Sequence, residues 1–177
     1  SIDRVFEDDI TPEGIIVNID HHQTNKVYGN INYIDPSACA VGAQIFEIVH
    51  TLGLTFTPEI SNNLFLAILA DTGGFKYSNK TTSTFEIAAQ LCRYGANPSW
   101  VAQEFYSNVT LETVQITAEV LRTLHFEFDG KLLWSEITQE IYQKYGGEQN
   151  EPESLVGELR RIKGVEVAIL IHELSEG

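Results

Sequence analysis

Residues 15–22 have the sequence IIVNIDHH, a short and mostly apolar run that ends in polar side chains. An apolar run of this length is typical of a buried β-strand. We therefore predict a strand over residues 15–20 that ends at Asp20. Asp20, His21 and His22 then lie where the strand gives way to a loop.

The residues that follow carry strand and helix patterns in turn. Apolar spacing predicts a second strand over 30–34 and helices over 38–52, 57–71, 83–95, 97–106 and 110–124. Thr57 before Pro58 predicts an N-cap, and Ser83 with Glu86 predicts a capping box. This mixture of strands and helices predicts the α/β class.

The pattern changes after residue 124. Two short strands over 125–128 and 131–137, joined through Asp129-Gly130, predict a β-hairpin. A helix over 139–145, a helix over 154–162 and a strand over 165–171 follow. The change predicts a second, smaller unit that begins near residue 125.

The composition limits the class of protein. The 177 residues include 43% hydrophobic residues, which is enough for a folded core, and two cysteines, which cannot form a disulfide framework. A net charge of −14 argues against binding long nucleic acid, and no apolar run reaches membrane-spanning length. We expect a cytoplasmic protein. The chain contains no methionine, so we expect that part of the gene product lies upstream.

Asp20, His21 and His22 are the first candidate site. In open α/β sheets ligands bind outside the carboxyl ends of the strands, which is where these residues are predicted. Imidazole and carboxylate groups bind manganese, zinc or iron, and an adjacent carboxylate can orient a ligating imidazole. A polar turn with two solvated histidines is an equally good interpretation of these three residues alone.

The sequence DTGGF at residues 71–75 is the second candidate site. Asp71 is predicted at the C-terminal end of an apolar helix, where the helix dipole disfavours an acid and a bound cation would compensate. Gly73 and Gly74 would let backbone amides approach a ligand closely. A glycine-rich helix end, with Asp71 starting a turn, is the alternative.

The remaining candidates have structural interpretations. His50 is predicted near a helix C-terminus, followed by Gly53 just past the end of that helix. Cys39 and Cys92 are predicted as small core residues. Walker, nucleophile-elbow and dinucleotide-binding glycine motifs are absent from the sequence.

Two motifs together resemble a known family. IDHHQTN at residues 19–25 and ILADTGGFKYSNKTT at residues 68–82 resemble the third and fourth motifs of the DHH phosphoesterase superfamily. The segment YGNINYIDPSACAVGAQIFEIV at 28–49 resembles the branch of bifunctional oligoribonucleases and 3′-phosphoadenosine 5′-phosphate (PAP) phosphatases, the nanoRNases. The resemblance implies a parallel-sheet DHH domain over 1–108, incomplete at its N-terminus and flanked by helices. A linker helix over 109–124 and the beginning of a smaller α/β DHHA1 domain over 125–177 would follow.

The resemblance also implies a site with two divalent ions, usually manganese, with magnesium or cobalt as other possibilities. His21 and Asp71 would bind one ion, and His22 would contact the scissile phosphate. Asp20 would support catalysis mainly by orienting these groups. From the glycine argument above, and not from the resemblance, we expect Gly73 and Gly74 to bind substrate. The implied substrates are short RNA, cleaved to nucleoside monophosphates, or PAP, cleaved to AMP; a homodimer is also implied.

The chain departs from the family pattern at both ends. The first two motifs, which supply further metal ligands, would lie before Ser1, and the glycine-rich substrate motif would lie after Gly177. We therefore expect a fragment that itself binds metal poorly and is inactive. Cyclic-dinucleotide phosphodiesterase, exopolyphosphatase and pyrophosphatase activities remain open, as does a non-catalytic module that has lost its metals.

Overall fold

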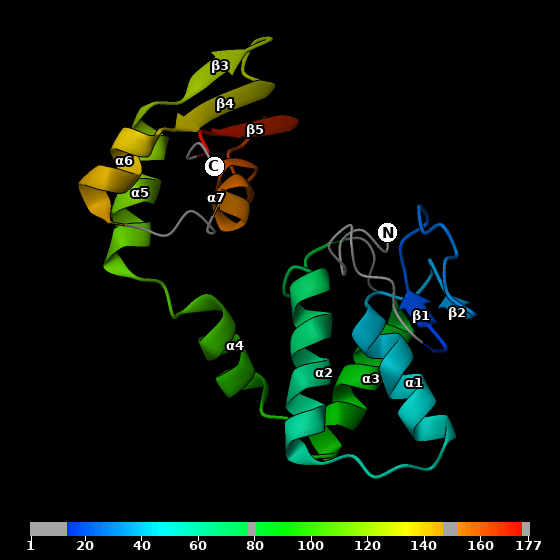
Figure 1. Cartoon of the computed structure of the whole chain (residues 1–177). Coiled ribbons are helices and arrows are strands. Elements are labelled where there is room, and N and C mark those ends of the chain that lie inside the picture. Colours follow the sequence, from blue (N-terminus) through cyan, green and yellow to red (C-terminus); the bar gives the residue numbers. More distant parts are fainter. Residues whose placement is uncertain (1–13, 78–80, 147–151, 175–177) are drawn as a thin grey trace. The chain divides into compact units, whose positions relative to one another are not determined.

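The computed structural model describes residues 14–77, 81–146 and 152–174. The chain divides into two compact units between Ser107 and Asn108 (Figure 1). Each unit has its own core and is described by itself.

The first unit contains a parallel pair of strands. Strands β1 (Val17–Asp20) and β2 (Ile31–Ile34) pair in parallel, so that Asp20 lies opposite Ile34. Because parallel strands end at the same edge, Asp20 stands at the carboxyl edge of the pair. The predicted strand end at Asp20 and the α/β class are confirmed.

Four helices follow in this unit. They are α1 (Val41–Thr51), α2 (Pro58–Asp71), α3 (Thr82–Arg93) and α4 (Pro98–Tyr106). Thr57 caps α2 as predicted, since its Oγ1 accepts a hydrogen bond from the backbone N–H of Ile60 at 3.2 Å. Gly53 follows α1 with φ +64°, the left-handed conformation that ends many helices.

The predicted start of α3 is wrong by two residues. The N-cap is Thr81 rather than Ser83, and the backbone N–H of Thr81 donates to Thr84 Oγ1 at 3.0 Å. Thr84 therefore occupies the N3 position of the capping box, which was predicted for Glu86. A buried threonine serves here because its hydroxyl reaches back one turn as a carboxylate would.

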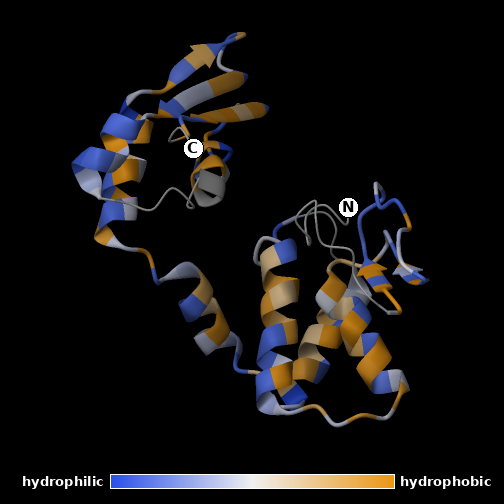
Figure 2. Cartoon of the chain, in the orientation of Figure 1, coloured by the Kyte–Doolittle hydropathy of each residue, from blue (hydrophilic) through white to orange (hydrophobic). Residues whose placement is uncertain are grey.

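The helices enclose the core of the first unit, and Figure 2 shows apolar residues along α1, α2 and α3. The buried apolar residues are Cys39, Ala40, Ala43, Phe46, Leu64, Phe65, Ile68, Leu69, Ile87, Ala88, Leu91, Ala96 and Val101. Cys39 is buried as predicted, whereas Cys92 is exposed. The reason is helical geometry, because Cys92 lies about 100° around α3 from the buried Leu91.

A glycine contact sets how closely α1 approaches α2. A Cβ atom built on Gly42 would lie 2.7 Å from Ala67 Cβ and 3.1 Å from the carbonyl oxygen of Leu64. The first turn of α1 therefore packs against the last turns of α2 with no room for a side chain. This packing brings the loop before α1 close to the C-terminal end of α2.

The second unit is a three-stranded sheet with helices. Its strands are β3 (His125–Glu127), β4 (Leu132–Ile137) and β5 (Val167–His172), in the order β3-β4-β5, and its helices are α5 (Leu111–Arg122), α6 (Gln139–Tyr145) and α7 (Pro152–Leu159). Strands β3 and β4 form the predicted antiparallel hairpin, and β5 pairs in parallel with β4.

The core of this unit includes α5, which lies within the predicted linker helix over 109–124. Ile116 and Val120 of α5 are buried with Leu133, Ile137, Tyr142, Leu155 and Leu159. The assignment of the two units to DHH and DHHA1 domains stays a prediction. None of the helices in the described ranges is long and apolar enough to span a membrane.

Candidate functional site

Asp20 organises the loop that follows β1. Its Oδ1 accepts hydrogen bonds from the backbone N–H groups of His21 at 2.7 Å and His22 at 3.1 Å. The same oxygen lies 2.6 Å from His22 Nδ1. Asn25 Nδ2 donates to the other oxygen, Oδ2, at 2.5 Å. Both carboxylate oxygens of Asp20 thus have hydrogen-bond partners, and all of these partners belong to the loop that follows β1.

These hydrogen bonds decide the ionisation of Asp20. Partial burial raises the pKa of its carboxyl group, but the hydrogen bonds from Asn25, from the His22 side chain and from the two backbone amides together outweigh it. The net pKa lies well below the ordinary 3.8. Asp20 is therefore a carboxylate at neutral pH and can only accept, so His22 Nδ1 carries the proton that it donates.

His21 faces a different direction. Its Nδ1 lies 3.2 Å from the carbonyl oxygen of Ala38, in the loop before α1, and its Nε2 lies 3.6 Å from Asp71 Oδ2 at the end of α2. A carbonyl can only accept, so Nδ1 carries a proton, and Nε2 is the ring nitrogen that faces Asp71. The structure thus brings together two predicted metal ligands that lie fifty positions apart in the sequence.

The separation of His21 Nε2 and Asp71 Oδ2 suits a shared metal ion. At 3.6 Å the two atoms are too far apart for a hydrogen bond. Each metal–ligand bond of a histidine nitrogen or a carboxylate oxygen is about 2.0–2.2 Å, so both atoms can reach one ion. A backbone carbonyl that fixes the other imidazole nitrogen, as Ala38 does, is typical of metal-binding histidines. These two residues therefore fit a metal ion.

The described ranges do not complete a metal centre. Among residues 14–77, 81–146 and 152–174, no group of three or more His, Cys, Asp or Glu side chains could hold an ion.

His22 is placed for a separate task. Its ring lies edge-on to that of His21, with centroids 4.6 Å apart and planes at 62°. The His22 side chain is 60% exposed, whereas that of His21 is 16% exposed. With Nδ1 held by Asp20, the Nε2 atom of His22 remains for a ligand in solvent.

The turn after Asp71 is held by Thr72. Its buried hydroxyl donates to the carbonyl oxygen of Ile68 at 2.7 Å and accepts from the backbone N–H of Phe75 at 3.0 Å. These two hydrogen bonds hold a tight turn immediately after the predicted ligand Asp71. They fix the residue at which α2 ends.

Gly73 and Gly74 form the glycine-rich helix end that was the alternative prediction for residues 71–75. Their backbone N–H groups donate to the carbonyl oxygens of Ala70 and Leu69, at 3.0 and 2.7 Å, and so are engaged by the helix end. Both have positive φ, and a Cβ on either would collide with a tyrosine, Tyr77 over Gly73 and Tyr106 over Gly74. Contact of these glycines with substrate stays a prediction.

Sequence reasoning missed one buried residue at this edge. Gln44 of α1 is 1% exposed, and its Nε2 donates to the carbonyl oxygens of Asp20 at 3.1 Å and Tyr33 at 3.3 Å. It therefore ties the ends of β1 and β2 to α1. A glutamine at an inward-facing helix position was the only available signal.

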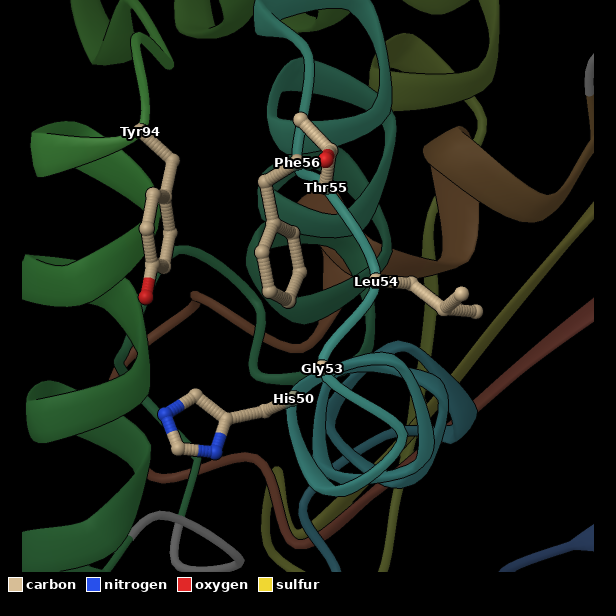
Figure 3. Close-up of a pocket in the computed structure, with 6 residues that line it drawn as sticks. All are labelled: His50, Gly53, Leu54, Thr55, Phe56 and Tyr94. Atoms are coloured by element: carbon tan, nitrogen blue, oxygen red, sulfur yellow. The ribbon is translucent and has the colours of Figure 1, made fainter.

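His50 lies away from this site. His50 is in the last turn of α1, and its ring stacks on that of Phe46, with centroids 5.8 Å apart. Figure 3 shows the pocket that it lines with Gly53, Leu54, Thr55, Phe56 and Tyr94. None of these residues belongs to the predicted site, which supports the structural interpretation of His50.

Comparisons with known proteins bear on the family. No protein-family model matches the chain. The bifunctional oligoribonuclease and PAP phosphatase NrnA of Thermus thermophilus is 28% identical over 165 residues, which cover 93% of this chain and 49% of that protein. Its namesake in Bacillus subtilis is 25% identical over 172 residues, 95% of this chain and 54% of that protein. The chain is a relative of these two proteins. The expected resemblance is confirmed.

The solved structures agree on the fold. An exopolyphosphatase-related protein from Bacteroides fragilis superposes with a TM-score of 0.79 at 20% identity, over 86% of this chain and 46% of that one. This likeness supports the α/β fold. The chain spans about half the length of the curated relatives it matches.

Proposed function

We propose that the complete protein is a metal-dependent phosphoesterase that hydrolyses short oligoribonucleotides to nucleoside monophosphates, PAP to AMP, or both. The observation that carries the proposal is the approach of His21 Nε2 and Asp71 Oδ2 to 3.6 Å, at the edge where β1 ends. The named activities of the relatives from Thermus and Bacillus support the substrate class.

The proposed metal is manganese, in a site of two ions, with magnesium or cobalt as substitutes. His21 and Asp71 would hold one ion, and residues outside this sequence would supply the rest. Bound metal ions of this kind activate water and stabilise the charge on a transferring phosphoryl group.

The remaining side chains have roles that follow from their positions. His22 presents Nε2 to solvent and would contact the scissile phosphate, while Asp20 holds the opposite nitrogen at 2.6 Å. A small substrate suits a chain of net charge −14, because a few bound cations can reverse the field locally without a large basic surface. A cytoplasmic location and a homodimer are part of the same proposal.

The proposal is tested on the complete gene product with manganese. We expect release of mononucleotides from RNAs of two to five residues, or of phosphate from PAP, and loss of this activity in His21→Ala and Asp71→Asn. His50→Ala is the matched control, since it removes a histidine of the same unit outside the site and should retain activity.

Three results would count against the proposal. Inactivity of the wild-type protein on both substrates would favour the non-catalytic module. Hydrolysis of polyphosphate, pyrophosphate or cyclic dinucleotides instead would select another DHH activity. Full activity of the Asp71→Asn variant would remove Asp71 from the metal site.

A further inference from the structure

Three asparagines, Asn18, Asn25 and Asn32, form a hydrogen-bonded group next to Asp20. Asn18 on β1 and Asn32 on β2 are partners in the strand register, and Asn18 Nδ2 donates to Asn32 Oδ1 at 3.1 Å. Asn18 Nδ2 also donates to Asn25 Oδ1 at 3.0 Å. Asn18 is 3% exposed, so the group is anchored inside the first unit.

The loop between the strands is folded onto this group. Asn32 accepts from the backbone N–H of Gly29 at 3.0 Å and donates to its carbonyl oxygen at 2.6 Å. A Cβ on Gly29 would lie 2.9 Å from Asn18 Cβ, so the backbone crosses Asn18 at a distance that only glycine permits. The loop is therefore fixed at its Gly29 end.

Asn25 connects the group to the site with its two amide atoms. Oδ1 accepts from Asn18 and from the backbone N–H of Val27, the latter at 2.8 Å, and thus serves the loop. Nδ2 donates to Asp20 Oδ2 at 2.5 Å, on the carboxylate that holds His22, and also to Asn18 Oδ1 at 3.4 Å. Asn25 therefore links the asparagine group to the Asp20 carboxylate.

The consequence concerns the direction of the His22 ring. With Oδ2 held by Asn25, the Asp20 carboxylate turns Oδ1 toward His22 Nδ1. Without Asn25, Asp20 Oδ1 keeps its two backbone donors, but Oδ2 loses the side-chain donor that helps to fix the rotation of the carboxylate. His22 would then lose a fixed partner for Nδ1, and with it a fixed direction for Nε2.

We propose that Asn25 is a positioning residue that acts through Asp20 to hold the His22 ring with Nδ1 protonated and Nε2 directed to substrate, and that Asn18 and Asn32 hold Asn25. The importance for turnover rests on the proposed function. The state of the His22 ring does not, so it can be measured independently.

The test compares Asn25→Asp and Asn25→Ala with Asn30→Ala in the complete gene product. Asn25→Asp keeps the size and the Oδ1 acceptor but removes the N–H donors toward Asp20. Asn30→Ala is the matched control, because Asn30 lies in the same loop and bonds only the backbone N–H of Ile16 among the hydrogen bonds described for it.

The first readout is the nitrogen-15 NMR signature of the histidine rings at about pH 8, where neutral imidazole predominates. We expect His22 to be protonated at Nδ1 in the wild type and in Asn30→Ala, and to be a mixture of both tautomers in the two Asn25 variants. His21, held by Ala38, should stay unchanged throughout and so serves as an internal control.

The second readout is turnover of the RNA or PAP substrate. We expect kcat and kcat/KM to fall together by about 10–100-fold in both Asn25 variants, the range found for residues that orient metal ligands, with KM nearly constant. Asn30→Ala should stay within about twofold of the wild type, a loss of less than roughly 0.5 kcal/mol.

The outcomes separate the two proposals. An unchanged His22 tautomer in both folded Asn25 variants overturns the positioning role, whatever the activity. An inactive wild type with the expected tautomer change overturns the proposed function and leaves the positioning role standing. If Asn25→Asp does not fold, Asn25→Ala and the reciprocal variant Asn18→Ala decide the same question by the same NMR signature.

Discussion

The close approach of α1 and α2 at Gly42 makes a quantitative prediction. A Cβ on Gly42 would lie 2.7 Å from Ala67 Cβ, whereas carbon atoms in contact prefer about 3.5–4.0 Å. The Gly42→Ala substitution therefore forces the helices apart by about 1 Å. Overpacking of this kind costs about 1–3 kcal/mol, and the gain in helix propensity returns about 0.5–1 kcal/mol.

The net expectation for Gly42→Ala is a loss of about 1–2 kcal/mol in the unfolding free energy of the first unit. For a unit of this size that lowers the thermal midpoint by roughly 5–10 °C. The same movement separates the loop carrying Ala38 from the end of α2 carrying Asp71, so the proposed metal site should also bind its ion more weakly.

Gly157→Ala is the matched control. Gly157 lies within α7 of the second unit, and a Cβ there would meet nothing within 4 Å. The same substitution should stabilise that unit by about 0.5–1 kcal/mol, because alanine loses less backbone entropy than glycine in a helix.

The assay can separate the two units because each holds one of the two tryptophans, Trp100 in α4 and Trp134 in β4. Fluorine NMR of the 5-fluorotryptophan protein gives one signal for each unit during thermal unfolding. A Gly42→Ala protein whose Trp100 signal melts at or above the wild-type midpoint would refute the close-packing argument.

Further outcomes follow from the site. Gln44→Met should destabilise the first unit by about 1–3 kcal/mol, measured by urea unfolding, because two strand-end carbonyls lose their buried donor. Thr84→Val should cost about 1 kcal/mol by the same assay, whereas Glu86→Ala should change stability by less than about 0.5 kcal/mol. Asp20→Asn should lose most stability near pH 6 and less as the pH falls below 4. The folded-state pKa of Asp20 lies below the ordinary 3.8, so its contribution is complete above that value and disappears as the carboxylate is protonated. An Asp20→Asn effect that grows in acid would contradict this sign.

Sequence patterns predicted the backbone frame of the site. The end of β1 at Asp20 and the end of α2 at Asp71 follow from apolar runs closed by polar residues and glycines, which are local signals. The approach of His21 to Asp71 followed only from family resemblance, because it depends on packing between elements fifty residues apart.

Other parts of the site had no local signal. Asn18, Asn25 and Asn32 look like ordinary loop and strand-end polar residues until the parallel register sets two of them side by side. The backbone N–H groups of Gly73 and Gly74 bond to carbonyl oxygens of α2, because a helix end satisfies its own carbonyls first. The capping-box error arose because Ser83-x-x-Glu86 and Thr81-x-x-Thr84 overlap in the sequence.

The turn held by Thr72 has a consequence for the order of folding. Every hydrogen bond described for the Thr72 hydroxyl reaches no more than four residues along the chain, so the end of α2 can form as soon as the helix does. The contact of His21 with Asp71 instead closes a loop of fifty residues, which is slow and entropically costly. We expect the end of α2 with Asp71 to form early and the loop with His21 to join it last.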